Sequence, residues 1–262
     1  MKFKAIITDL DGTAVDSPVV KVASNRLAKS VKELDELGIK VCAATGRPQS
    51  FAYIILKSMN LKDPTIVSGG TKIIDPISGE DLWVCGLDPD IMHKTVSKLK
   101  KLSYGFLWND FTEEDYLGGG WNINDFSEYD STYFFNICFV PSNEVKEVLD
   151  ILSQIDGIVA TVVVSQRHNM NDIHITNLNA TKEHAIYELE KMIGVNKNEM
   201  IGIGDGHNDI HLYNAVGYKV AMGNAVNDLK AIADTVIGDV KEDGLAIYFE
   251  ELTSKIKKGE EL

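Results

Sequence analysis

The chain of 262 residues is strongly acidic, with 39 acidic residues against 26 basic ones and a formal net charge of −13. Its long-range field repels other polyanions, so neither nucleic acid nor an anionic membrane surface is expected as a partner. With 44% hydrophobic and 25% charged residues it has the composition of a globular protein, and its length suffices for one large or two modest domains.

Neither a secretory signal nor a membrane span is predicted at the start of the chain. The apolar run at 5–7 is too short for either one. Cys42, Cys85 and Cys138 lack the spacing of metal ligands and are expected to be free thiols, as is usual in a reducing compartment. We therefore predict a cytoplasmic protein. The oligomeric state does not follow from the sequence.

The first part of the chain alternates between short apolar runs, which are typical of strands, and helical patterns. The predicted elements are a strand at 5–8, a helix at 21–37, a strand at 39–44, a helix with Pro48 at its first position, and a strand at 65–67. Strands separated by single helices, with apolar runs instead of alternation, predict a parallel sheet that is covered on both faces.

The middle of the chain has a different pattern. A hairpin is predicted over 73–84, and several strands then follow with few helices between them. The predicted elements are a helix at 89–102, strands at 106–108 and 133–140, a helix at 142–154, and strands at 158–164 and 172–175. This order predicts an α+β insert of about 90 residues, which is an ordinary size for a domain.

The alternation of strand and helix returns towards the end of the chain. The predicted elements are a helix at 181–193, a strand at 200–203, a helix from 208, and strands at 218–222 and 235–237. The charged tail after Thr253 is expected to be frayed.

Two carboxylates, Asp9 and Asp11, come directly after the first predicted strand and are followed by Gly12. Ligands of open α/β sheets bind beyond the carboxyl ends of the strands. One carboxylate can act there as a nucleophile and the other as a proton donor, and Mg²⁺ prefers such hard oxygen ligands. Taken alone, the segment is also compatible with an ordinary turn that has polar caps.

Thr45, Gly46 and Arg47 follow the second predicted strand and open a helix, as Lys182 does further along the chain. A hydroxyl, an amide and a helix N-terminus suit a phosphate group. Both cations oppose the helix dipole, which is reasonable if an anion lies between them. The alternatives are an ordinary threonine cap and solvated surface charges.

The segment from Gly204 to Asp209 follows another predicted strand. Asp205 is placed to be a third magnesium ligand, and Asn208 could donate to a phosphate oxygen or orient a carboxylate. Asp209 would also suit the helix dipole as a simple cap. His207 has no evident partner, so we interpret it as an exposed loop histidine.

In this order and spacing, these four segments resemble the four motifs of the haloacid dehalogenase superfamily. The insertion between Thr45 and Lys182 resembles the large α/β cap of its Cof-type subfamily. The resemblance implies an α/β fold with a Rossmann-like doubly wound core over 1–85 and 179–262 and an α+β cap domain over 86–178. One departure is Ser68-Gly69-Gly70, which stands where the subfamily usually has Asn-Gly-Ala.

The resemblance also implies a role for each matching residue. Asp9 is similar to the nucleophile, and Asp11 to the general acid and base. The implied magnesium ligands are Asp9, the carbonyl of Asp11 and Asp205, with Asp209 in support. The implied phosphate-binding groups are Leu10 through its amide, Thr45, Gly46, Lys182 and Asn208, with Arg47 as a further candidate.

The predicted function is hydrolysis of a small phosphorylated metabolite with Mg²⁺ as cofactor and an aspartyl-phosphate as intermediate. A sugar phosphate is the favoured substrate class, because such compounds are the commonest substrates of similar proteins. Two alternatives stay open: a phosphomutase that uses the same nucleophile, and a binding or regulatory protein whose catalytic site has decayed.

Overall fold

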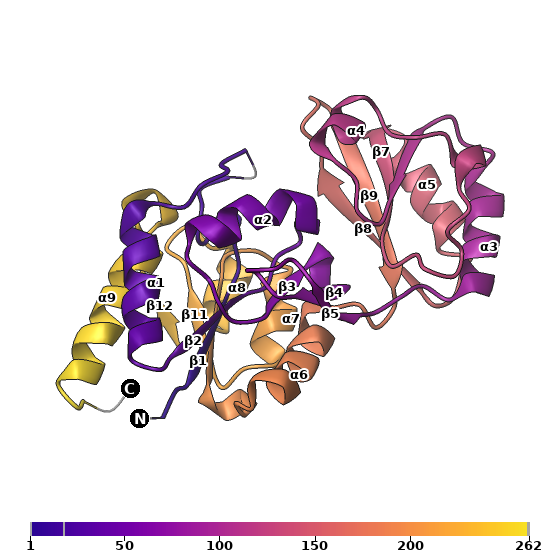
Figure 1. Ribbon diagram of the computed structural model, residues 1–262. Helices are drawn as coiled ribbons and strands as arrows, with labels where there is room; N and C mark the ends of the chain where they lie inside the picture. Colours follow the sequence, from indigo (N-terminus) through magenta and orange to yellow (C-terminus); the bar gives the residue numbers. More distant parts are fainter. Residues whose placement is uncertain (1, 18, 261–262) are drawn as a thin grey trace. The chain divides into compact units, whose positions relative to one another are not determined.

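The computed structural model describes residues 2–17 and 19–260, which form two compact units (Figure 1). One unit consists of the chain up to Trp83 together with the chain from Thr181 onward, and the other is Val84–Ala180. The expected boundaries, after residues 85 and 178, each lie two residues from these. The assignment of the units as catalytic core and cap stays a prediction.

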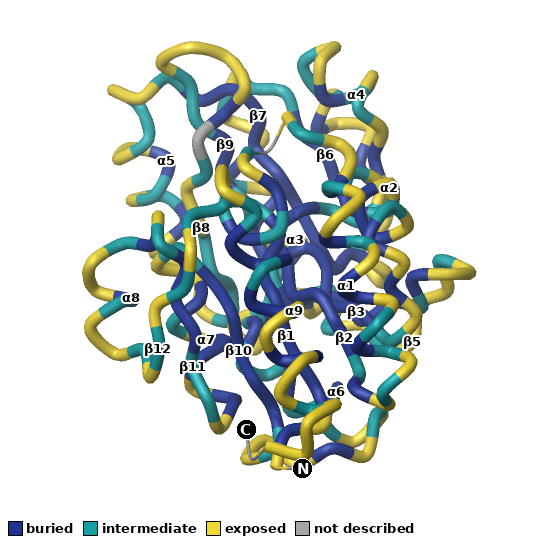
Figure 2. The backbone as a smooth tube through the Cα atoms, turned by 90° about the vertical axis from the view of Figure 1, so that its left-hand side faces the viewer, coloured by how far each residue is buried: buried dark blue, intermediate teal, exposed yellow. Residues whose placement is uncertain are grey.

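The first unit is built on a five-stranded sheet in which every neighbouring pair is parallel. Its strand order is β12-β11-β10-β1-β2, with bounds of Thr235–Val236, Tyr218–Ala221, Met200–Gly204, Ala5–Thr8 and Lys40–Ala43. The central strands β1 and β10 are buried along their whole length (Figure 2). The predicted α/β class with a Rossmann-like parallel sheet is confirmed.

Helices cover both faces of this sheet. Figure 1 shows α1 and α9 side by side on one face and α6 packed with α7 on the other. The helices of this unit are α1 Asn25–Glu36, α2 Gln49–Ser58, α6 Lys182–Ile193, α7 Asp209–Asn214, α8 Asn227–Ala231 and α9 Gly244–Lys257. Among the described residues, no helix combines the length and apolar character that crossing a membrane requires.

Several helix boundaries differ from the sequence-based expectation. Helix α1 begins at Asn25 and not at residue 21, because the Ser24 hydroxyl accepts the backbone N–H of Leu27 and caps the helix. Pro48 has an extended ψ of 152° and is the N-cap of α2, not its first residue. The tail expected to fray after Thr253 continues as helix α9 to Lys257.

The predicted hairpin is part of a small second sheet with the strand order β3-β4-β5. The three strands are Thr65–Val67, Lys72–Ile74 and Asp81–Val84. The turn between β4 and β5 is held by Asp75, whose Oδ1 accepts the backbone N–H of Ile77 at 2.7 Å and that of Ser78 at 3.1 Å.

The second unit is an α+β insert, as expected, with an antiparallel sheet of order β6-β7-β9-β8. Apolar residues of the central strands, such as Ile137 and Ile173, form its core together with Met92 and Val148 of two helices. The strands are Gly105–Trp108, Phe135–Pro141, Met170–Asn177 and Ile158–Val164, and the helices are α3 Pro89–Leu99, α4 Glu113–Leu117 and α5 Val145–Leu152.

Candidate active site

The parallel pairing of β1 with β10 brings two distant segments to one edge of the sheet. Thr8 lies opposite Ile203, and the backbone N–H of Asp9 donates to the carbonyl of Ile203 at 2.9 Å. The residues that follow the two strands therefore emerge together. Asp9 and Asp205 meet at this edge although 196 positions separate them in the sequence.

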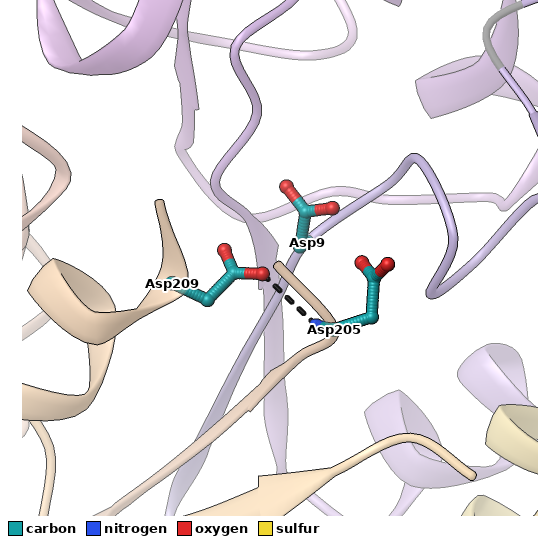
Figure 3. A group of neighbouring side chains, drawn as sticks. All are labelled: Asp9, Asp205 and Asp209. Atoms are coloured by element: carbon teal, nitrogen blue, oxygen red, sulfur yellow. Dashed lines mark hydrogen bonds between the residues drawn. The ribbon is translucent and has the colours of Figure 1, made fainter. Parts of the chain in front are cut away.

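Asp209, in the first turn of α7, completes a cluster of three carboxylates (Figure 3). One oxygen of each lies within 4.8 Å of the others, and the three side chains point to the same side. The orientation of Asp209 is fixed by the turn before it, because its Oδ2 accepts the backbone N–H of Asp205 at 2.9 Å and that of Gly206 at 3.0 Å. Asp9 and Asp209 are buried, and Asp205 is half-buried.

Lys182, the first residue of α6, supplies the positive charge of the cluster. Its Nζ donates to Asp9 Oδ1 at 2.6 Å and to Asp209 Oδ1 at 2.7 Å. Burial of the ammonium disfavours its charge, but the two carboxylates outweigh this effect and raise the pKa of Lys182. The lysine is therefore a buried, charged bridge between β1 and α7, and not the solvated surface charge of the alternative interpretation.

One ammonium does not balance three carboxylates. Burial, with a further contribution from Asp209 and despite the opposing effect of Lys182, raises the pKa of Asp9 to about 8. Burial and then Asp209 raise the pKa of Asp205 to about 6. A divalent cation would relieve this excess of negative charge. The oxygen donors suit Mg²⁺, and their spread is close to the ~4.2 Å between opposite oxygens of an octahedral shell.

Gly12 allows the loop after β1 to approach Asp205 closely. Its φ is +79°, and a Cβ at this position would lie 2.2 Å from Asp205 Oδ2. The next residue, Thr13, donates from its hydroxyl to Asp205 Oδ1 at 3.1 Å. From the neighbouring loop, Asn224 donates to the Gly12 carbonyl at 2.7 Å. No role was predicted for Thr13 or Asn224 from the sequence.

Asp11 and Arg47 form a bidentate ion pair at the same edge of the sheet. The guanidinium donates to the two carboxylate oxygens at 2.9 and 2.5 Å, and it also donates to the carbonyls of Ser17 and Val20. Arg47 is 9% exposed. It was expected as a cation that faces an anionic ligand, whereas here it holds the Asp11 side chain in one orientation.

The remaining predicted phosphate-binding residues differ in exposure. Thr45 is fully buried, and its hydroxyl oxygen accepts the backbone N–H of Arg47 at 3.1 Å, as in a cap. Gly46 and Asn208 are exposed, the latter directly before α7, whereas the side chain of Leu10 is buried. Their roles in binding phosphate stay predictions. His207 is exposed, as expected.

Comparison with known proteins identifies the family. The family model of haloacid dehalogenase-like hydrolases matches residues 6–249. The chain belongs to this family. A phosphoglycolate phosphatase of Archaeoglobus fulgidus is 28% identical over 244 residues, which cover 93% of this chain and 94% of that protein. A 5-amino-6-(5-phospho-D-ribitylamino)uracil phosphatase of Bacillus subtilis is 24% identical over 255 residues, or 93% of each chain.

Solved structures of this family share the fold. A haloacid dehalogenase-like hydrolase from Bacteroides thetaiotaomicron superposes with a TM-score of 0.79 at 22% identity, covering 96% of this chain and 100% of that one. A sugar phosphatase of subclass IIB gives 0.70 at 21% identity, with 95% and 98% covered. Together with the family match and the curated relatives, these comparisons confirm the predicted family and the predicted enzyme class, a phosphatase.

Proposed function

We propose that this hydrolase cleaves the phosphomonoester bond of a small phosphorylated metabolite, with Asp9 as the nucleophile and Mg²⁺ as cofactor. The observation that carries the proposal is the position of Lys182, whose ammonium bridges Asp9 and Asp209 beside Asp205. Side chains that directly follow β1 and β10 or open α6 and α7 thus gather into one largely buried, polar group. A merely structural set of surface carboxylates would have no need of this arrangement.

Asp9, Asp205 and the carbonyl of Asp11 would hold the magnesium ion, with Asp209 fixing the loop that carries Asp205. When bound, the ion supplies the positive charge that allows a carboxylate to approach a phosphate dianion. Lys182 contributes a second positive charge from the protein itself. It lies against Asp9, where it can also contact the oxygens of the transferring phosphoryl group.

The reaction divides into two steps that use two carboxylates. Asp9 attacks phosphorus while the bond from phosphorus to the leaving oxygen breaks, and Asp11 gives that oxygen a proton. Asp11 then takes a proton from a water molecule, whose oxygen attacks phosphorus, so that inorganic phosphate leaves and Asp9 is regenerated. Arg47 holds both Asp11 oxygens in the structure, so the ion pair must release at least one of them before Asp11 can carry the proton. Thr45 and nearby amides would stabilise the charge that spreads over the phosphoryl oxygens.

A sugar phosphate is the substrate class we favour. The support is the family resemblance and the similarity in fold to a sugar phosphatase of subclass IIB. We also place the enzyme in the cytoplasm, because Cys42, Cys85 and Cys138 are free thiols and two of them are buried.

Replacing either carboxylate tests the mechanism. We expect Asp9→Asn to lower kcat by about 10⁴-fold or more, because the nucleophile is removed. Asp11→Asn should lower kcat by about 10²–10⁴-fold with a sugar phosphate. Its effect should be smaller with p-nitrophenyl phosphate, because that leaving group departs without a proton. The assay measures phosphate release with and without MgCl₂, and circular dichroism checks that each variant is folded.

The same assay separates the alternatives. A phosphomutase would require a bisphosphate activator and release little free phosphate, whereas a binding protein would release none from any substrate. A panel of phosphorylated sugars, phosphoglycolate and other small phosphate esters, compared by kcat/KM, identifies the substrate class. Wild-type turnover in folded Asp9→Asn would refute the assignment of the nucleophile.

A further inference from the structure

Strand β8, Ile158–Val164, forms an open edge of the insert's sheet. It is the last strand in the order β6-β7-β9-β8, and no strand pairs with its outer side within residues 2–17 and 19–260. Its pairing with β9 is continuous over seven positions without a bulge. Val162 is 41% exposed and Thr161 is exposed, and Figure 2 draws much of the strand in the colours of partly and fully exposed residues. A row of backbone donors and acceptors is therefore available to another strand.

This edge lacks the features that usually protect one. The sequence of β8 is IVATVVV, with no charge, no proline and no glycine. The opposite edge of the sheet is partly occupied, because Phe106 of β6 exchanges two backbone hydrogen bonds with Trp121, at 2.6 and 3.0 Å. In the other unit, β12 has only two residues and β5 carries the charge of Asp81. The long unprotected edge of β8 stands apart from these.

An apolar hollow of about 450 Å³ adjoins the strand on the side of α5. Leu178, which lines this hollow, is 56% exposed, and its backbone N–H donates to the carbonyl of Gly157, directly before β8. A strand added to the edge would thus also find apolar surface to cover. The hollow is lined among others by Leu149, Leu152, Ile155, Ile158, Ala160 and Leu178.

The two ends of β8 carry opposite charges. Asp156 stands two positions before the strand, and Arg167 stands three positions after it; both are exposed. The guanidinium of Arg167 is held in place over the ring of Phe139, at 3.6 Å, and by a hydrogen bond to the Leu117 carbonyl at 2.9 Å. If two copies of β8 lie antiparallel, Asp156 of each copy faces Arg167 of the other. Parallel strands would instead place like charges together.

We propose that β8 is the interface of a homodimer, in which two copies pair antiparallel about a twofold axis near Thr161. A second copy is favoured over an unrelated strand for two reasons. Its β8 is equally apolar, and its Asp156 and Arg167 have charges opposite to those that they would face on the first copy. The paired strands would be about 24 Å long. Because a chain with a net charge of −13 repels its own copies elsewhere, an uncharged strip is where two copies can approach.

Sedimentation velocity from about 5 to about 200 µM tests the interface. The wild-type protein should change from the 28.9 kDa of one chain towards about 58 kDa as its concentration rises. Val162→Lys should remain monomeric, because it places two ammonium groups close to the twofold axis where they repel each other. Thr161→Lys is a second variant with the same expectation, used if the first does not fold. Thermal denaturation checks folding.

The matched control is Val236→Lys, since Val236 is a similarly exposed valine, at 52%, on the edge strand β12 of the other unit. It should dimerise like the wild type. Asp156→Lys should weaken the dimer, because it places a second cation opposite Arg167 of the other copy. A wild-type protein that stays monomeric over the whole range, or a dimer that Val162→Lys leaves equally strong, would overturn the proposal. The catalytic residues are not involved, so the outcome is independent of the proposed reaction.

Discussion

At the scale of single residues, the turn after β3 connects the segment of Thr45 and Arg47 with the start of α6. Ser68, Gly69 and Gly70 have positive φ angles of 51°, 71° and 114° in succession. The N–H of Ser68 donates to the Arg47 carbonyl at 2.7 Å, and the N–H of Gly69 donates to the Thr45 carbonyl at 3.0 Å. A buried serine in this conformation costs about 1–3 kcal/mol, which the surrounding contacts offset.

Gly70 lies on the other side of this turn, against the start of α6. A Cβ at Gly70 would lie 2.3 Å from the carbonyl carbon of Thr181 and 2.8 Å from the backbone nitrogen of Lys182. Glycine here, where the Cof-type pattern has alanine, therefore allows α6 to begin close to the turn. The distance between Lys182 and Asp9 depends on this close approach.

We predict that Gly70→Ala lowers kcat by up to ~100-fold, because the added methyl group displaces the backbone that carries Lys182. The control is Gly69→Ala, which also has a positive φ, 71° against 114° for Gly70, but open space around the added Cβ. Both variants should lose about 1–2 kcal/mol of stability from backbone strain, but Gly69→Ala should keep nearly the wild-type kcat. Steady-state kinetics and urea denaturation measure the two effects separately. Equal kcat values in the two variants would contradict the prediction.

At the scale of elements, His174 on β9 shows how strand pairing leaves a polar side chain only partly exposed. It lies opposite Asn136 of β7 and Thr161 of β8, and its ring packs edge-on to that of Phe134 at 4.8 Å. Burial lowers the pKa of His174 from 6.5 to about 4. The folded protein therefore holds this ring neutral where the unfolded chain would bind a proton.

The neutral His174 ring makes the stability of the folded protein depend on pH. Between pH 6.5 and about 4 the unfolded state binds a proton at this residue that the folded state does not, so His174 lowers stability as the pH falls. Above pH 6.5 it has no effect. We predict that the melting temperature of His174→Gln, relative to wild type, rises steadily as the pH falls from 6.5 to about 4. Thermal denaturation at several pH values measures it, and a constant difference between the two proteins would contradict the lowered pKa of His174.

At the scale of the whole molecule, charge dominates. A chain with a net charge of −13 concentrates three carboxylates at one buried edge and has one lysine against them. Binding of a divalent cation to the folded state alone must therefore stabilise the protein.

We predict that MgCl₂ raises the melting temperature more than NaCl of equal ionic strength. At a Mg²⁺ concentration ten times its Kd, the gain in the free energy of unfolding should be about 1.4 kcal/mol. The specific part of the shift should disappear in Asp205→Asn, whose amide oxygen can still accept the Thr13 hydroxyl but carries no charge. Differential scanning calorimetry measures both proteins. An equal Mg²⁺ shift in the variant would mean that the ion binds elsewhere.

Much of this molecule follows from local sequence alone. The short apolar runs before Asp9 and before Gly204 predicted β1 and β10, because buried parallel strands need apolar side chains on both faces. The carboxylates and Thr45 were expected at one edge of the sheet, because residues that follow parallel strands emerge together. Lys182 was included as a cation at a helix N-terminus and because of the family resemblance. Helix ends were less predictable, since Ser24 and Pro48 act through capping geometry that depends on single hydrogen bonds and backbone angles.

Other features were decided only by the tertiary structure. The sequence marked Arg47 as a cation near an anion, but the anion it contacts is Asp11, 36 positions away. The contribution of Thr13 and Asn224, the close approach of Gly70 to α6 and the open edge of β8 were equally invisible. The physical reason is that local pattern reports which side chains are buried and where strands end, whereas a polar side chain takes as partner whatever group the packing of distant segments brings within about 3 Å.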